Sequence, residues 1–143
     1  MLDMTLTKVG GLLALGFGEA GSEIISKNIS DGSEVDPFLP GQKTICIFGS
    51  CQIKQYAAVN SSLESETTLF VNTIGAIVHG IVYKYSGSAN KNLGDTFLII
   101  WKFDQDDTRV NYLTGELELL PSYQVTQLCE MSMISFLKII AAI

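Results

Sequence analysis

The sequence predicts an α+β domain built from a strand, a long helix, two strands and a second helix. Apolar residues recur at three- and four-residue spacing over 62–85 and 124–141, which is typical of helices packed along one face. A short apolar run at 44–49 and two runs at 87–92 and 96–103 have the patterns of strands. With 143 residues, of which 47% are hydrophobic and 17% charged, the chain is long enough for one domain with a real core.

The first 42 residues are predicted to be a helical lead-in and a loop, ahead of a domain over 43–143. Residues 1–29 form an amphipathic pattern interrupted by glycines, and 30–43 hold two of the three prolines. Gly16 to Gly21 fit the G-x-G-x-x-G pattern of dinucleotide-binding loops. A dinucleotide-binding loop also requires a second strand that ends in an acidic residue, and in this sequence prolines stand at that place. The favoured interpretation is therefore that the glycines let a linker helix pack closely against the domain.

The first strand leads into a turn that offers the amide of Gln52. Ser61 and Glu64 have capping-box spacing at the start of the predicted helix, and Gly87 suits its C-terminal cap. His79 has no acid or cysteine at i+3 or i+4, so a packing or surface role is favoured over metal binding. The apolar positions of this helix are Phe70, Ile74, Ile77, Val78, Ile81, Val82 and Tyr85.

The hairpin over 88–103 turns through Asn-Leu-Gly-Asp and presents a carboxylate at Asp95. Lys91 stands four residues earlier, so a cation and an acid are expected near one another at the end of the sheet. A phosphorylated ligand and its metal ion could use both groups. A Gly-Asp pair is also ordinary turn chemistry, so a purely structural role for both residues is the alternative.

The C-terminal part is predicted to be an irregular acidic segment over 104–124 followed by a helix over 124–141. Residues 104–107 lack the central glycine and closing glutamate of a calcium-binding loop, which favours a solvated acidic loop. The predicted apolar face of the final helix consists of Val125, Leu128, Cys129, Ser132, Met133, Phe136, Leu137 and Ile140.

Composition argues against several functional classes. A net charge of -6 with only nine basic residues disfavours binding to a nucleic-acid backbone. The three cysteines, Cys46, Cys51 and Cys129, form no even framework, which indicates reduced thiols in a cytoplasmic protein. The longest apolar runs, 9–17 and 133–143, are shorter than the roughly 20 residues of a membrane span, so we expect no transmembrane segment.

The order of strand, long helix and Lys-x-x-Gly-Asp hairpin resembles the catalytic domain of class III nucleotide (adenylate/guanylate) cyclases, protist type. The resemblance covers about residues 8–103 and only the N-terminal half of that domain. It includes the segment 10–25 and the stretch from Phe70 to Trp101. It implies a truncated ferredoxin-like domain, its β-α-β-β-α portion, with one sheet edge and one face exposed. Poor solubility or self-association of the chain is therefore expected.

The resemblance also implies site residues and a cofactor, Mg²⁺ or Mn²⁺. Asp95 would bind one metal ion, Gln52 would stand where the family's acid binds both, and Ile53 would offer its backbone carbonyl. Lys91 would read the adenine of ATP. A neutral amide at Gln52 would weaken metal binding, and the family's transition-state residues have no counterpart before Ile143, so no catalytic residue is assigned.

The resemblance implies that the chain is a fragment or degenerate member of the cyclase family and is inactive alone. Active members of that family convert ATP to cyclic AMP and pyrophosphate. Completion would require dimerisation with another cyclase domain. The alternative is a noncatalytic interaction module that pairs with a complete cyclase domain. A cytoplasmic location is expected, with any membrane association supplied by a partner or by further segments.

Overall fold

A computed structural model describes residues 43–143, which form one compact unit. The predicted helical lead-in and loop, and the pattern from Gly16 to Gly21, lie outside the described residues. The described part is an α+β fold, which confirms the predicted fold class, and it contains the predicted strand, long helix, two strands and final helix in that order, with further short elements between them.

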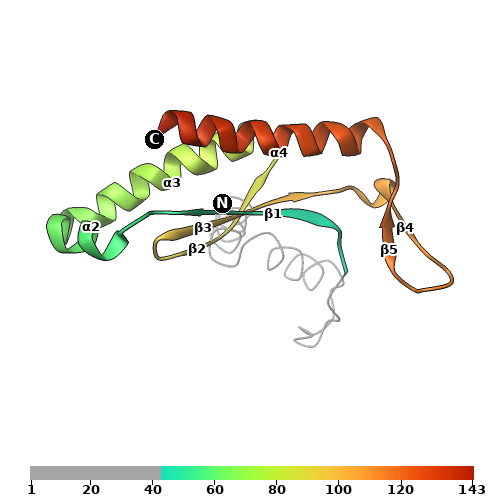
Figure 1. Cartoon of the computed structure of the whole chain (residues 1–143), viewed down its shortest axis with the longest axis horizontal. Coiled ribbons are helices and arrows are strands. Elements are labelled where there is room, and N and C mark those ends of the chain that lie inside the picture. Colours follow the sequence, from blue (N-terminus) through green and yellow to red (C-terminus); the bar gives the residue numbers. More distant parts are fainter. Residues whose placement is uncertain (1–42) are drawn as a thin grey trace, which may run out of the picture. The chain divides into compact units, whose positions relative to one another are not determined.

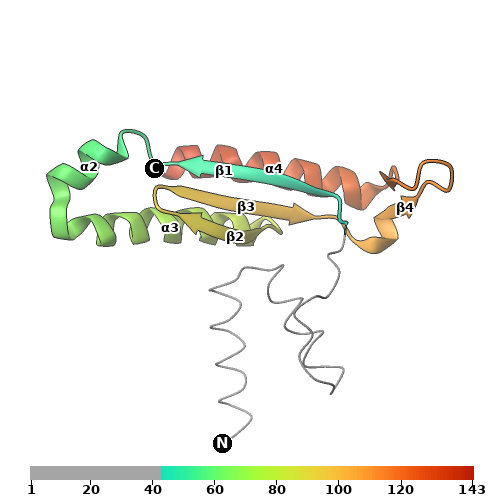
Figure 2. The same ribbon diagram turned by 90° about the horizontal axis from the view of Figure 1, so that it is seen from below.

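A three-stranded antiparallel sheet forms the centre of the domain, with strands β1 (Cys46–Gln52), β2 (Ser88–Leu93) and β3 (Thr96–Lys102) in the order β1-β3-β2. Two helices, α3 (Thr67–Lys84) and α4 (Tyr123–Ala142), cover the same face of this sheet (Figure 1). Seen from the open face, α4 lies behind β1, and α3 lies behind β2 and β3 (Figure 2).

The core lies between the sheet and the two helices. Phe97, Ile99 and Trp101 alternate along β3 and are at most 2% exposed. Because alternate residues of a strand point to the same face, these three side chains all meet the helices. The indole Nε1 of Trp101 donates to the backbone oxygen of Tyr85 over 2.9 Å, so burial leaves its polar atom satisfied. The other buried members of this core are Val78, Val82 and Ile139.

The predicted helix 62–85 is interrupted, and its predicted capping box is wrong. The chain forms α2 (Tyr56–Leu63), a 3₁₀ turn at Glu64–Glu66, and then α3. Ser61 lies inside α2, where its Oγ donates to the backbone oxygen of Ala57 over 2.9 Å rather than capping a helix. Glu64 has a φ of 45°, which ends α2 because the next turn cannot continue in right-handed geometry.

The C-terminal cap of α3 differs from the prediction by one residue. Ser86, with a φ of 61°, takes the left-handed position that was expected of Gly87. The N–H of Gly87 donates to Val82 O over 2.9 Å and that of Ser86 to Tyr83 O over 3.3 Å, the two bonds of a Schellman cap. Gly87 is needed for space, since a Cβ there would lie 2.6 Å from the Trp101 indole.

The segment predicted to be irregular, 104–124, contains a small hairpin. A 3₁₀ turn at Gln105–Asp107 leads into β4 (Thr108–Val110), which pairs with β5 (Leu117–Leu119). Arg109 and Asn111 both contact the Glu118 carboxylate, at 3.2 Å and 2.6 Å, and hold its pKa below the ordinary value, Asn111 more than Arg109. This side-chain pairing across the strands is what the prediction missed.

Helix α4 begins at an N-cap that ties it to this hairpin. The Oγ of Ser122 accepts from the Val125 N–H over 3.0 Å and donates to Asp107 Oδ1 over 2.7 Å. In the described part of the chain, α4 is the one helix whose length and composition would suit a membrane span. Its Phe136 packs on Trp101, with ring centroids 5.7 Å apart, so here it is a helix of the domain's core layer.

Candidate functional site

Three of the four predicted site residues meet where β1 ends beside the β2–β3 turn. Gln52 Nε2 donates to Asp95 Oδ2 over 3.1 Å, and Thr96 Oγ1 donates to Asp95 Oδ1 over 3.0 Å. The Ile53 N–H donates to the backbone oxygen of Asp95 over 2.9 Å. The Gln52 amide, and then the Thr96 hydroxyl, lower the pKa of Asp95 by hydrogen bonding to its charged form. The carboxylate therefore joins β1 to the hairpin turn.

The turn itself explains why Asp95 takes this position. Leu93 and Thr96 form the last pair of the hairpin, which leaves Gly94 and Asp95 as a two-residue loop. Gly94 has a φ of 61°, as the first position of a type II′ turn requires. Thr96, the first residue of β3, pairs with Gln52 at the end of β1. Asp95 directly precedes Thr96, so it lies beside the end of β1 and meets Gln52.

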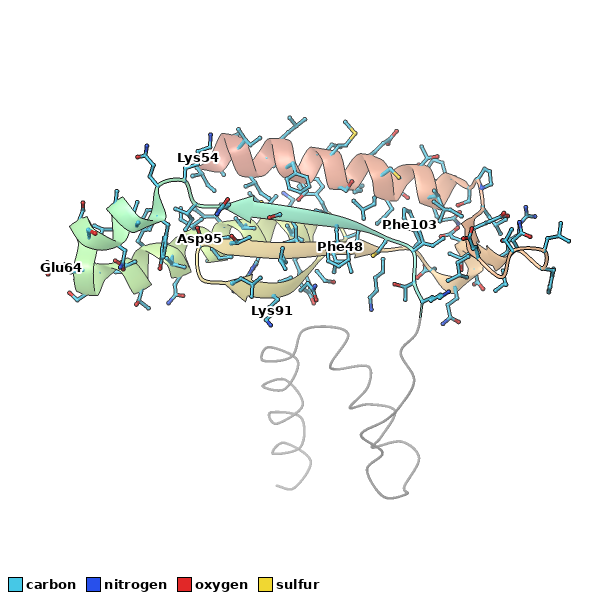
Figure 3. The ribbon with its side chains drawn as sticks, turned by 60° about the horizontal axis from the view of Figure 1, so that its bottom comes forward. Phe48, Lys54, Glu64, Lys91, Asp95 and Phe103 are labelled. Atoms are coloured by element: carbon cyan, nitrogen blue, oxygen red, sulfur yellow. The ribbon has the colours of Figure 1, made fainter. Side chains whose placement is uncertain are left out.

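Lys91 does not join this group. It pairs with Leu98 in the β2–β3 register, two pairs away from the end of the hairpin. Its side chain points away from Asp95 on the open side of the sheet (Figure 3). The expected proximity of this cation to the Asp95 carboxylate is wrong, because four residues of sequence here span part of a strand as well as the turn.

Beside Gln52 lies a small apolar pocket of about 180 Å³. The Cys51 thiol in its wall has a pKa raised by burial, so it stays protonated and weakly nucleophilic at neutral pH. The pocket is lined by Cys51, Gln52, Ile53, Lys54, Phe70, Ile74, Val78, Phe97 and Ile143.

His79 has the packing role that the sequence favoured. Its Nε2 lies 3.2 Å from Asn92 Oδ1, and its ring meets the edge of Phe97 at a centroid distance of 5.7 Å. It thereby connects α3 to the hairpin.

The residues around Asp95 do not fit a two-metal site. Each carboxylate oxygen of Asp95 already accepts a side-chain hydrogen bond, and Gln52 presents its NH₂ group, which cannot ligate a cation. Within residues 43–143, no three His, Cys, Asp or Glu side chains cluster as metal ligands would. We therefore derive no chemical step through a metal ion.

A surface that sequence reasoning missed lies on α4. Met133, Leu137 and Ile140 were predicted to face the core, but they are 69%, 65% and 75% exposed. The helix buries Ser132, which belongs to the predicted face, together with Ser135 and Ile139, which do not. The spacing i, i+4, i+7 of the exposed residues forms a second apolar stripe, which was the available signal. We call these three residues, Met133, Leu137 and Ile140, the α4 flank.

Comparisons with known proteins give one partial match. A family model described as the RasGEFs all helical domain matches residues 1–30, which is less than half of the chain and lies outside the described residues. No curated protein and no solved structure matches the chain. The expected membership in the class III cyclases is corrected by this finding, because the matching family is a different one. The roles that the cyclase resemblance gave to Gln52, Ile53, Lys91 and Asp95 stay predictions.

Proposed function

We propose that residues 43–143 are a noncatalytic protein-interaction module that binds its partner through the α4 flank. The observation that carries this proposal is the exposure of Met133, Leu137 and Ile140, each at least 65%, on a helix whose other face is already packed. Burying one such side chain contributes about 1.5–3 kcal/mol. Three neighbouring large apolar side chains on one helix face are typical of a surface that binds a helix or a strand of a partner protein.

The surroundings of the Asp95 carboxylate and the Cys51 thiol support the same proposal. The Asp95 carboxylate is held by neutral donors that join two parts of the fold, and the Cys51 thiol is kept protonated by burial. Both groups have structural explanations that leave no need for a catalytic one.

A membrane surface is a less favourable partner for this helix. The charged residues of α4 are Glu130 and Lys138, one of each sign, whereas helices that lie on membranes carry several Lys or Arg on the polar face. The net charge of the whole chain, -6, adds repulsion from anionic lipid.

The proposal is tested with the whole chain and a double variant, Met133→Glu with Leu137→Glu. Gln127→Glu is the matched control, because it adds a charge to α4 beside the groove that contains Ser86, away from the α4 flank. A partner recovered with the unmodified chain is purified, and its Kd is measured for each protein. We expect at least about a hundredfold weaker binding for the double variant, from the loss of two buried anchors, and no change for the control. Equal binding by all three proteins, or binding to lipid vesicles that the double variant abolishes, would contradict the proposal.

A further inference from the structure

The outer edge of β1 presents unpaired backbone groups among the described residues. The N–H of Ile53 donates to Asp95 O, and the oxygen of Ile45 accepts from the Phe103 N–H, so odd-numbered residues at both ends of β1 bond toward β3. The β1–β3 register runs without a shift from Cys46 to Gln52. Because N–H and C=O groups alternate sides along a strand, the groups that point outward belong to Cys46, Phe48, Ser50 and Gln52.

Within residues 43–143, this edge has none of the features that usually prevent strand pairing. The seven residues of β1, Cys-Ile-Phe-Gly-Ser-Cys-Gln, include no charge and no proline, and the strand has no bulge. The opposite edge, β2, carries Lys91 and a register shift between Ala89 and Lys91. Charged residues and bulges are the usual protection of edge strands, so in the described part of the chain β2 is protected and β1 is open.

Helix α4, which carries the α4 flank, packs on the strand that forms this edge. Phe136 of α4 crosses β1 so closely that a Cβ on Gly49 would lie 2.5 Å from its Cζ. Met133 precedes Phe136 by three residues and Ile140 follows it by four, so both are neighbours of Phe136 on the helix surface. Since α4 lies behind β1 (Figure 2), a strand added at the edge would have one face toward α4.

We propose that the β1 edge accepts one extended segment of a partner protein, which continues the sheet as a fourth strand beneath the α4 flank. This inference rests on the proposed function and names its binding mode. The segment is about seven residues long to match β1, with apolar side chains at alternate positions toward α4 and polar ones toward the open face.

A second copy of this chain fits the edge less well than a single strand. Two β1 strands paired with one another would lie about 4.8 Å apart. Their two α4 helices, each behind its own β1, would then approach more closely than the 8–10 Å that packed helices require.

The test uses the whole chain and a fluorescein-labelled seven-residue peptide of alternating valine and threonine, with a lysine at each end for solubility. Fluorescence anisotropy gives Kd for the unmodified chain, for Ser50→Pro and for Ser50→Thr. Proline removes an outward N–H and blocks the edge, but it breaks no bond to β3. We expect saturable binding by the unmodified chain and by Ser50→Thr, and at least about tenfold weaker binding by Ser50→Pro, from the lost hydrogen bond and the blocked edge.

A second measurement does not depend on how Ser50→Pro folds. Two further peptides carry N-methyl groups on the valines alone or on the threonines alone. The N–H groups of successive residues point to opposite edges of a strand, so only the valines or only the threonines donate to β1. One methylated peptide should therefore lose binding, and the other should keep it. Equal behaviour of the two methylated peptides, or a Kd unchanged in a folded Ser50→Pro, would overturn the strand mode. A dimer of the unmodified chain that Ser50→Pro abolishes would also overturn it, in favour of self-association.

Failure of this inference differs from failure of the proposed function. If the purified partner binds through the α4 flank but Ser50→Pro leaves that Kd unchanged, the strand mode is wrong and the interaction module stands. If neither the α4 double variant nor Ser50→Pro changes partner binding, both are wrong.

Discussion

Replacing Gly49 with alanine should move α4 away from β1 at the point where the two elements touch. The new Cβ would lie 2.5 Å from Phe136 Cζ and 2.7 Å from Ile99 Cγ1, both closer than carbon atoms can pack. Overpacking of this kind lowers the free energy of unfolding by about 1–3 kcal/mol. For a domain of this size, that loss lowers Tm by at least about 4 °C.

The measurement is urea unfolding of the whole chain followed by the fluorescence of Trp101, the single tryptophan, which is fully buried. Phe136→Leu shortens the side chain that causes the clash, so the double variant with Gly49→Ala should lose less stability than the sum of the two single variants. A coupling of about 0.5–3 kcal/mol is expected for residues in contact.

Gly80→Ala is the matched control for this experiment. Gly80 lies within α3, where a Cβ would meet nothing within 4 Å, so alanine there should raise stability by about 0.5–1 kcal/mol through its better helix propensity. A loss at Gly80 equal to that at Gly49, or strictly additive effects of Gly49→Ala and Phe136→Leu, would refute the contact between α4 and β1.

Three further predictions concern other elements. Ser86→Gly should stabilise the domain by about 1 kcal/mol, because glycine takes a φ of 61° without strain, and a lower urea midpoint would contradict the Schellman cap. Ser122→Ala should cost about 1 kcal/mol through loss of the α4 N-cap, which thermal unfolding would show; a Tm equal to that of the unmodified chain would contradict this role. Gln52→Leu should raise the pKa of Asp95 toward its ordinary value, as followed by NMR titration. Because hydrogen bonding lowers the folded-state pKa of Asp95, its contribution to stability is present above the unfolded-state pKa and is lost as pH falls through the folded-state value. An Asp95 titration that Gln52→Leu leaves unmoved would mean that the amide does not hold the carboxylate.

The sequence predicted the α+β class and the order of the central elements because hydrophobic periodicity is a local property. It did not predict the break at Glu64, where a positive φ ends α2, or the hairpin stabilised by Arg109, Asn111 and Glu118. Both depend on contacts or backbone angles that no pattern of hydrophobic residues encodes.

The main error about the surface was to place Met133, Leu137 and Ile140 in the stripe of α4 that faces the sheet. That helix carries two apolar stripes, and periodicity alone does not choose between them. The structure buries the face with Ser132 and Ser135, whose small side chains allow close approach. The larger Met133 and Leu137 are left outside. Gln52 and Asp95, which the cyclase resemblance placed at one site, are brought together by the pairing of β1 with β3, whereas the position of Lys91 depended on the hairpin register.

Amide hydrogen exchange of the whole chain, free and with the purified partner, tests the open β1 edge most directly. In the free chain, the amides of Phe48 and Ser50 should exchange rapidly, while those of Ile47, Gly49 and Cys51, which point toward β3, should be protected. Addition of the partner should slow Phe48 and Ser50 selectively. Protection of Phe48 and Ser50 already in the free chain, or no change at these two amides when the partner is bound, would contradict the proposed binding edge.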